Sequence, residues 1–577
     1  MGPRLALRQT AILLLVASLL PVELVMSQTQ PWVAVSEYGM VASDSPHASE
    51  AGARILRLGG NAIDAAAATA LALGVTRPYS AGLGGGGFLM VRLGDTGEVH
   101  LLDYRECAPG ASTPDMFVRA RAADPEFSPS MYGGLAVAVP GHLAGHAALL
   151  ERFGSKPLYL IVEPAAELAE QGFPIDEHYR SVALDMLKTS EKSAKLKEIS
   201  AGLRERLLFG GTIPPVGTRL VQPEMAQTLR AIGEHGPNVF YRGPIGEAIV
   251  RTVRRHGGLM TMEDLARYKP VWREPIRAKY RSYEVLLMPP PSSGGICIAQ
   301  TLNILEHWNL ASLRREDPGL AAHLTVEALK HAFADRARHL GDADFVEVPI
   351  EKLTSEAYAA ELAKKIRLDG VSEANSYGWH LDDDHGTTHF CVADRWGTVV
   401  AATETINLTF GSLLVAEGTG IVLNDEMDDF TAEPGKPNAF GLRQSAQNAV
   451  APYKRPLSSM SPTIVLQDGK PVLAVGASGG PRIITGTLQV MLNVIEYGMP
   501  VGDAIEQPRL HHQWQPNVVY RNRFSPDDSV IAGLAKRGHE ISSQRREATV
   551  QALQIRDGKY IGASDPNKGG LPVGLTE

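Results

Sequence analysis

The sequence has few cysteines and only one apolar run, at its N-terminus, and each scarcity excludes a class of protein. Of its 577 residues three are cysteines, Cys107, Cys297 and Cys391. They are far apart and odd in number, so neither a disulfide framework nor a Cys-x-x-Cys metal site is predicted. Each is expected to be a small buried residue. Without a second long apolar run, the mature protein is expected to be soluble.

An excess of positive charge is also absent. The formal net charge is −8, the isoelectric point is near 6.1, and no dense Lys/Arg run occurs. This balance gives no electrostatic drive toward nucleic acid, so no nucleic-acid partner is predicted. Apolar residues make up 44% and charged residues 21% of the chain, which is typical of a globular protein.

The N-terminal segment has the pattern of a secretory signal peptide. Arg4 and Arg8 precede the apolar run 11–20, and Pro21 and a softer stretch ending at Ser27 follow it. We expect residues 1–27 to be a signal peptide and the protein to be secreted or periplasmic. The alternative is a signal anchor that stays uncleaved.

Hydrophobic periodicity predicts helices and strands in alternation, with no internal repeat. Helices are expected at 49–58, 64–73, 140–150, 158–171, 188–206, 261–268, 297–307 and 321–340. Strands are expected at 88–93, 99–104, 388–393, 399–405, 463–466 and 472–475. Helices on both flanks of antiparallel strands indicate a layered α/β protein, although periodicity leaves the number of layers open.

A glycine-rich segment at 82–87 fits the pattern G-x-G-x-x-G, which suggests a dinucleotide site. That fingerprint needs a strand before it and a helix after it, and here the predicted order is reversed. No Gly-Lys-Ser/Thr follows either. The segment is therefore interpreted as a turn that permits close backbone packing.

A second segment, His385-Gly386-Thr387-Thr388, could carry chemistry. A polar, acidic stretch runs into Gly-Thr, and a predicted strand begins at once. A threonine hydroxyl is a weak nucleophile, but a threonine at a chain terminus carries its own base, an α-amine with a pKa of about 7.7–8.0. Cleavage before Thr387 would create such a terminus. Alone, a Gly-Thr pair that opens a strand is usually structural.

The surrounding sequence changes that interpretation, because many short segments occur in a fixed order. They are 59–62, 82–88, 103–106, 289–295, 403–407, 410–412, 424–430, 456–462, 476–480 and 562–566. Together they resemble the gamma-glutamyltransferase (gamma-glutamyltranspeptidase) family of N-terminal nucleophile hydrolases, from about residue 41 to 565.

The resemblance implies a fold and a maturation step. The expected fold is a four-layer αββα sandwich, with two stacked, mainly antiparallel sheets flanked by helices. Autocleavage at Gly386–Thr387 would give a large subunit, 28–386, and a small subunit, 387–577, which stay together as one structural unit.

The resemblance also implies roles for individual residues. Thr387 is the expected nucleophile, and Thr405 the residue that helps to activate it. The substrate carboxylate is expected to meet a guanidinium, which suits bidentate contact, and two hydroxyls: Arg105, Ser458 and Ser459. The substrate ammonium is expected to meet Asn407, Glu426 and Asp429. The backbone amides of Gly479 and Gly480 are the expected oxyanion donors.

The implied activity is transfer of a γ-glutamyl group from glutathione or related compounds through a Thr387 ester. Water, an amino acid or a dipeptide would accept the group, and no cofactor is implied. One alternative is an acylase of the same fold that removes groups such as glutaryl, which lacks an ammonium for Glu426 and Asp429 to hold. A non-catalytic secreted binding protein is the alternative from another class.

Three further features are weighed. The pairs His511-His512 and His385/His389 lack the helical context and third ligand of a metal site, so no metal is predicted. Asn407-Leu408-Thr409 is a glycosylation sequon, but it overlaps the predicted site, so modification is not expected. Residues 434–455 are similar to the lid segment of some family members, with Phe440 where some have an aromatic hydroxyl.

Overall fold

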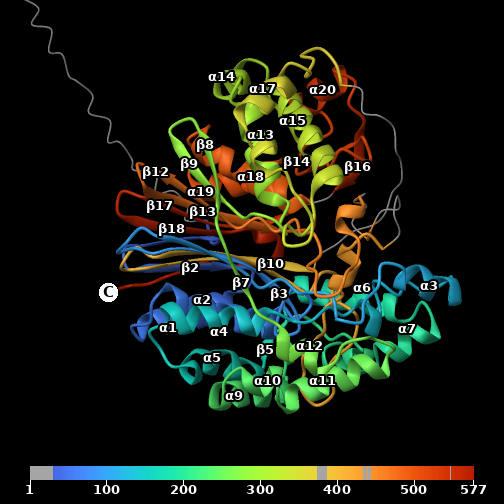
Figure 1. The fold of residues 1–577 in the computed structure, drawn as a ribbon. Coiled ribbons are helices and arrows are strands. Elements are labelled where there is room, and N and C mark those ends of the chain that lie inside the picture. Colours follow the sequence, from blue (N-terminus) through green and yellow to red (C-terminus); the bar gives the residue numbers. More distant parts are fainter. Residues whose placement is uncertain (1–29, 373–385, 433–437, 440–441, 443–444, 546–547) are drawn as a thin grey trace, which may run out of the picture.

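Two large antiparallel sheets form the centre of the molecule. The computed structural model describes residues 30–372, 386–432, 438–439, 442, 445–545 and 548–577 (Figure 1). One sheet has the order β1-β18-β17-β13-β12-β9-β8, formed by Val33–Ser36, Lys559–Ser564, Thr549–Arg556, Lys470–Ser478, Thr463–Gln467, Tyr283–Leu287 and Ile276–Tyr280. The other has the order β19-β2-β10-β11-β3-β4-β7, formed by Val573–Gly574, Gly39–Ser43, Thr387–Asp394, Val399–Thr405, Gly86–Arg92, Val99–Asp103 and Val271–Arg273.

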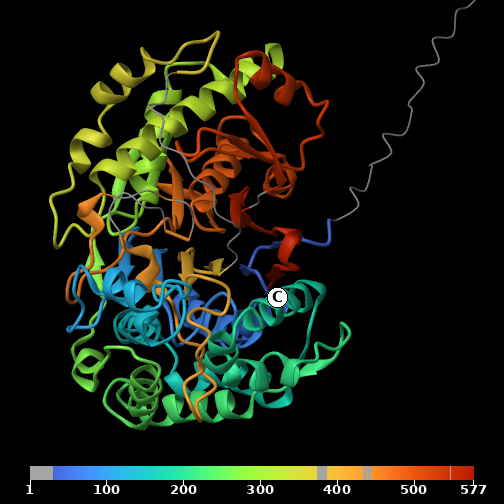
Figure 2. The same ribbon diagram turned by 90° about the vertical axis from the view of Figure 1, so that its right-hand side faces the viewer.

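Helices cover the outer face of each sheet, as Figures 1 and 2 show from two directions. Below the second sheet in Figure 1 lie α1, α2, α4, α5, α9, α10, α11 and α12, formed by Pro46–Arg57, Ala62–Thr76, His142–Phe153, Leu158–Gln171, Pro223–His235, Asn238–Tyr241, Pro244–Arg255 and Met262–Arg267. Above the first sheet lie α13, α14, α15, α17, α18, α19 and α20, formed by Gly294–Leu305, Leu310–Glu316, Pro318–His339, Glu356–Ala363, Arg482–Ile495, Val501–Glu506 and Ser529–Lys536. The predicted αββα sandwich is thus confirmed.

Smaller elements lie around these layers. The helices are α3, α6, α7, α8 and α16, formed by Met116–Ala123, Glu177–Ser190, Ala194–Ile199, Ala201–Arg206 and Ile350–Leu353. The strands β14, β15 and β16 (Arg509–His511, Val519–Asn522, Ile541–Arg545) make one small sheet, and β5 and β6 (Phe173–Pro174, Arg219–Leu220) make another.

The central strands are buried on both faces because their side chains alternate between two cores. On β10, Phe390 and Val392 join the core under α1, α2, α4 and α5, whereas Cys391 joins the core between the sheets and under α13, α15 and α18. The three cysteines are buried and unbonded to one another, as expected. The sheets approach closely, since a Cβ on Gly476 of β13 would lie 2.3 Å from the His389 ring of β10.

Most predicted elements occur, with ends shifted by a few residues. Capping boxes at Asn61 and Thr261 fix the starts of α2 and α12. The helical segment expected at 188–206 occurs as the end of α6 followed by α7 and α8, with breaks at Ser193 and Ser200. Within the described residues no helix is long and apolar enough to cross a membrane.

The glycine-rich segment 82–87 is a packing turn between α2 and β3, as interpreted from the sequence. A Cβ on Gly84 would lie 2.0 Å from the Val422 carbonyl oxygen, and one on Gly85 would lie 2.1 Å from that of Thr405. The absence of side chains therefore brings this turn against the backbone that carries Thr405.

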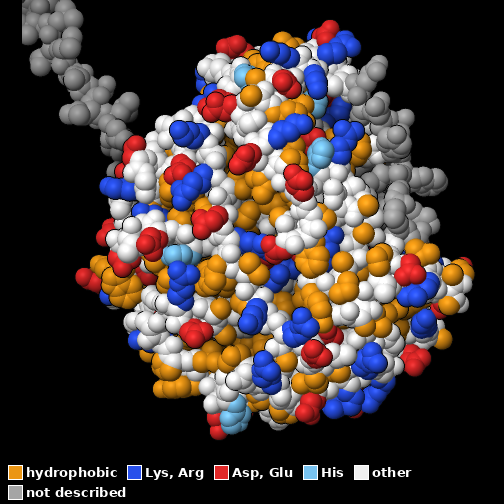
Figure 3. All heavy atoms as spheres, viewed as in Figure 1, with side chains coloured by type: hydrophobic (Ala, Val, Ile, Leu, Met, Phe, Trp, Pro, Cys, Tyr) orange, Lys and Arg blue, Asp and Glu red, His pale blue; other side chains and the backbone are white. Residues whose placement is uncertain are grey.

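Acidic and basic side chains are interspersed on the face shown in Figure 3.

Candidate active site

Strand pairing places two threonines opposite each other at one end of the second sheet. Thr387 begins β10 and Thr405 ends β11, and the two residues are direct partners in the antiparallel register. Their side chains therefore share a face. The two hydroxyl oxygens are 3.1 Å apart, and both residues are buried.

Hydrogen bonds around Thr405 fix the direction of that contact. The Thr405 hydroxyl donates to the Gly386 carbonyl at 3.0 Å and accepts the Asn407 backbone N–H at 2.8 Å. Because a hydroxyl has a single proton to donate, Thr387 must donate to Thr405. Thr405 thus polarises the Gly386 carbonyl and orients the Thr387 hydroxyl beside it.

Gly386 lies where no other residue fits. A Cβ at this position would lie 2.0 Å from the Asn407 carbonyl oxygen and 2.4 Å from the Leu408 carbonyl carbon. Asn407 itself has a positive φ of 73°, so the chain turns sharply after Thr405. The backbone of 407–408 therefore packs directly on the Gly386–Thr387 bond.

Lys568 contacts the backbone of the predicted nucleophile. It lies on the short 3₁₀ helix Pro566–Lys568, and its buried ammonium donates to the Thr387 carbonyl and to the Ser478 hydroxyl, each at 2.7 Å. The Asp44 carboxylate is 3.4 Å away. Sequence reasoning missed Lys568, because the closing segment 562–566 carried no chemical signal for the residue that follows it.

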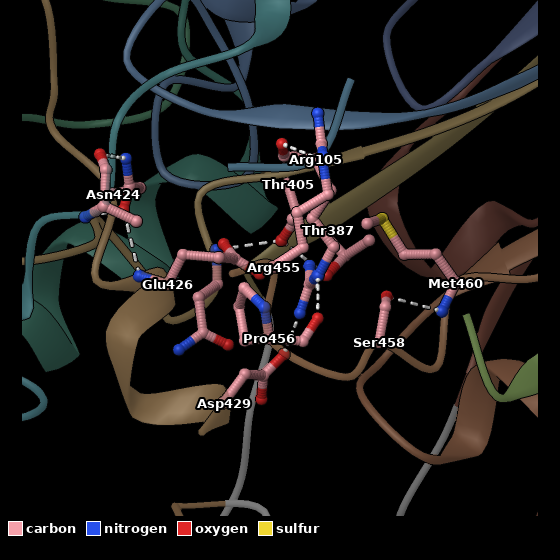
Figure 4. A network of polar contacts seen from close by, with 12 residues as sticks. Arg105, Thr387, Thr405, Asn424, Glu426, Asp429, Arg455, Pro456, Ser458 and Met460 are labelled. Carbon is pink, nitrogen blue, oxygen red and sulfur yellow. Dashed lines mark hydrogen bonds and ion pairs between the residues drawn. The ribbon is translucent and has the colours of Figure 1, made fainter. Parts of the chain in front are cut away.

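A buried charge cluster lies beside the threonines (Figure 4). Arg105 follows β4 and donates to Glu426, to Asp429 at 2.5 Å and to the Pro456 carbonyl at 2.6 Å. Both acids come from the 3₁₀ helix Glu426–Asp429. Burial raises the pKa of the Glu426 carboxyl to about 7, against the opposing charge of Arg105. Burial likewise raises the pKa of Asp429.

The serines and glycines complete the site. Ser458 accepts the Met460 backbone N–H at 3.1 Å, and its carbonyl accepts the Ser293 N–H at 2.8 Å, so the loop at 289–295 positions the serine turn. Gly479 and Gly480 have φ of 123° and 54° and directly precede Pro481 and α18. Glycine relieves the strain of both values, and the helix N-terminus favours nearby negative charge.

These residues surround one pocket. Its lining comprises Arg105, Thr387, Thr405, Asn407, Glu426, Asp429, Leu442, Ser458, Ser459, Met460, Gly480 and Ile483. Every predicted catalytic or substrate-binding residue is included except Gly479. The arrangement offers a positioned hydroxyl, a guanidinium, two carboxylates and hydroxyl donors within one cavity.

The chain as a whole is similar to known proteins. A family model described as Gamma-glutamyltranspeptidase matches residues 48–575. The chain belongs to the gamma-glutamyltranspeptidase family. The chain is 42% identical over 538 residues to the "Glutathione hydrolase proenzyme" of Escherichia coli (strain K12), covering 92% of this chain and 90% of that protein.

Solved structures agree with this membership. The cephalosporin acylase from Bacillus halodurans is similar with a TM-score of 0.83 and 30% identity, covering 95% of this chain and 99% of that one. The Helicobacter pylori gamma-glutamyltranspeptidase is similar with a TM-score of 0.52 and 37% identity, covering 57% of this chain and 91% of that one.

Two remaining predictions concern the glycosylation sequon 407–409 and the lid-like segment 434–455. The Asn407 side chain is buried and donates to the Asp425 carbonyl at 3.0 Å, so the sequon is inaccessible to glycosylation. The segment 434–455, predicted from the sequence to resemble a lid, is described in part, and Phe440 lies outside the described residues. Of the described part, Leu442 lines the pocket and Asn438 donates to Asp429 at 3.2 Å.

The histidine pairs considered in the sequence have other partners here. His511 contacts Thr485 at 3.0 Å and Gln513 at 2.9 Å, and His389 contacts Thr403 at 2.7 Å. His385 lies outside the described residues. A different histidine cluster, His142 and His146 with Glu404, was missed by sequence reasoning.

Proposed function

We propose that this protein is an autoprocessing gamma-glutamyltransferase and glutathione hydrolase. It cleaves the γ-glutamyl amide of glutathione and related compounds through an ester with Thr387. Water, an amino acid or a dipeptide then accepts the γ-glutamyl group. The observation that carries the proposal is the Thr387–Thr405 hydroxyl pair in a pocket that also presents Arg105, Glu426 and Asp429.

Maturation uses the same hydroxyl. The Thr387 oxygen attacks the Gly386 carbonyl, which Thr405 polarises, and the C–N bond breaks as the amine leaves. Water hydrolyses the resulting ester and frees the Thr387 hydroxyl and α-amine. Residues 28–386 and 387–577 then form two subunits. Because β10 and β11 pair with β2 and β3, the two subunits share a sheet and stay together.

In turnover the new α-amine acts as general base for the Thr387 hydroxyl. The hydroxyl attacks the γ-glutamyl carbonyl, the amine leaves with the transferred proton, and the γ-glutamyl ester remains. The amides of Gly479 and Gly480 stabilise the negative oxygen of the tetrahedral intermediate. The ammonium of Lys568, held on the Thr387 carbonyl, places a positive charge near the α-amine, which favours its neutral, basic form.

The far end of the γ-glutamyl group is a zwitterion, and the charge cluster matches it. Arg105, Ser458 and Ser459 receive the carboxylate, while Asn407, Glu426 and Asp429 receive the ammonium. The Asn407 side-chain amide donates to the Asp425 carbonyl, which leaves its side-chain oxygen to accept a hydrogen bond from the substrate ammonium. Arg105 already contacts both acids, so the substrate enters an existing network of alternating charge.

The structural likeness to a cephalosporin acylase makes a glutaryl acylase the second candidate. Glutaryl lacks the ammonium, which would leave Glu426 and Asp429 without the cation they are placed to hold. We expect kcat/KM for a γ-glutamyl anilide to exceed that for a glutaryl anilide by roughly 10²-fold, because the glutaryl group cannot form the buried charge contact of the ammonium.

Kinetics of the two anilides test the assignment. The double variant Glu426→Gln/Asp429→Asn should lose most of the preference while keeping the glutaryl rate. Equal kcat/KM values for the two anilides in the wild-type protein would favour the acylase reading.

The place of action is proposed from the N-terminal segment. Residues 1–27 have the signal-peptide pattern, so the protein is exported and acts as a secreted or periplasmic enzyme on γ-glutamyl compounds outside the cytoplasm. N-terminal sequencing of the exported large subunit tests this: a start near residue 28 agrees, and a start at Met1 contradicts it.

A further inference from the structure

Four polar side chains form a buried cluster on the helix-facing side of the second sheet. His142 and His146 lie one turn apart on α4, which places their rings on the same face of the helix. Glu404 of β11 reaches both, with its two oxygens 3.2 Å from His142 Nε2 and 2.6 Å from His146 Nε2. The Tyr104 hydroxyl donates to the same carboxylate at 2.9 Å.

The cluster lies directly behind the active site. Glu404 precedes Thr405 in the chain, and Tyr104 precedes Arg105, so the cluster joins the two backbone segments that carry these residues. Glu404 is opposite Gly87 of β3, whose missing side chain leaves room for the cluster. None of the four cluster residues lines the substrate pocket.

Among the described residues no lysine or arginine balances the charge of Glu404, so either a protonated imidazole or a bound cation must do so. Glu404 is fully buried, and within the described part of the chain neither Lys nor Arg forms an ion pair with it. A buried carboxylate without a cation is strongly unfavourable.

We propose that His142, His146 and Glu404 bind a divalent transition-metal ion, Zn²⁺ by ligand type, as a structural site behind the strand that carries Thr405. Two imidazoles and a carboxylate are a known protein ligand set for zinc. One ligand atom from each of the three residues lies within 4.8 Å of the other two.

The distances are close to those the ion requires. Bonds of about 2.1 Å in a tetrahedral arrangement separate ligand atoms by about 3.4 Å, so His142 is nearly in place and His146 needs to withdraw by less than about 1 Å. The Tyr104 hydroxyl orients the carboxylate, as outer partners of metal ligands do. Because the cluster is buried, the ion must enter during folding.

A second histidine–glutamate cluster supplies the contrast. His323, Glu327 and His539 also lie within 4.8 Å of one another. There Lys330 donates to Glu327 at 2.9 Å and supplies the missing cation. His323 contacts the Arg367 carbonyl at 2.6 Å and His539 at 2.7 Å, so both of its nitrogens are occupied. This cluster is satisfied without a metal.

The test is metal analysis of full-length protein made without a polyhistidine tag, in Zn²⁺-supplemented medium and without chelator. We expect about one Zn²⁺ per chain by mass spectrometry. The Zn²⁺ content should fall at least about tenfold in each of the variants His142→Gln/His146→Gln and Glu404→Gln. The matched control, His323→Gln/His539→Gln, should keep the wild-type content.

X-ray absorption at the zinc edge needs no variant, so it decides the question even if the variants fail to fold. Two imidazoles with oxygen ligands would support the site. Wild-type protein with less than about 0.1 Zn²⁺ per chain, sulfur or all-oxygen ligation, or variants that keep their metal would overturn it. In that case an imidazolium at His146 would balance Glu404 instead.

Discussion

At the scale of single residues, the account depends on where one proton can go. Thr405 has a single hydroxyl proton and gives it to the Gly386 carbonyl, so the Thr387 hydroxyl is held as a donor to Thr405. This geometry activates the scissile carbonyl and aligns the attacking oxygen at once. Neither effect requires a group from outside the chain.

Replacing Thr405 with the nearly isosteric valine should therefore slow self-cleavage. Removing a hydrogen bond to a carbonyl that gains negative charge costs roughly 10²–10³-fold in rate. The measurement is the time course of precursor loss on a denaturing gel. Thr405→Ser should cleave, as should the control Thr403→Val, which removes a hydroxyl bonded to His389 on the same face. Wild-type cleavage by Thr405→Val would contradict the role of Thr405.

Glu426 gives a second residue-scale prediction, for substrate binding and pH. Its pKa is raised to about 7 by burial, so the carboxyl becomes protonated and neutral as the pH falls through that value. A neutral carboxyl attracts an ammonium less strongly. The inhibition constant of L-glutamate should therefore rise, meaning weaker binding, from about pH 8.5 to about pH 6.

The control for this prediction is Glu426→Gln, which cannot titrate. Its inhibition constant should be higher than that of the wild type at about pH 8.5 and nearly flat over the same range. An equally steep pH dependence in Glu426→Gln would assign the titration to another group.

At the scale of elements, three separate parts of the chain meet at Thr387. The 3₁₀ helix Pro566–Lys568 places the Lys568 ammonium on the start of β10 and on Ser478 at the end of β13. Asp44, which follows β2, contacts the same ammonium and also accepts a hydrogen bond from the Thr388 hydroxyl at 2.9 Å. The nucleophile is therefore positioned by strands from both sheets.

Lys568→Met should keep the shape of this junction and remove its charge. Without the nearby cation the α-amine of Thr387 holds its proton more tightly. Because the amine acts in its deprotonated form, the acylation rate at saturating donor should then need a higher pH to reach its plateau. Lys568→Arg should restore part of the wild-type profile.

An unchanged pH profile in a folded Lys568→Met protein would show that the lysine serves packing alone. The melting temperature of each variant distinguishes this case from a general loss of structure.

At the scale of the whole molecule, the sequence predicted those features that short segments in a fixed order indicate. The αββα fold and nine of the pocket residues follow from such segments, because each lies beside a distinctive turn or strand end. Lys568 could not be predicted in this way, since its role depends on the fold bringing the C-terminal turn back to β10. Glu404 is more than 250 residues from His142 and His146 in the sequence, and strand pairing and helix packing bring it to them.

The central claim is that Thr387 becomes a chain terminus and then carries the γ-glutamyl group. Its most direct test is intact mass spectrometry of the purified protein before and after brief reaction with a γ-glutamyl anilide and an acid quench. The account predicts two fragments, the smaller beginning at Thr387 and heavier by one γ-glutamyl group after reaction, and a single uncut chain for Thr387→Ala. An adduct on the larger fragment, or a processed Thr387→Ala protein, would contradict it.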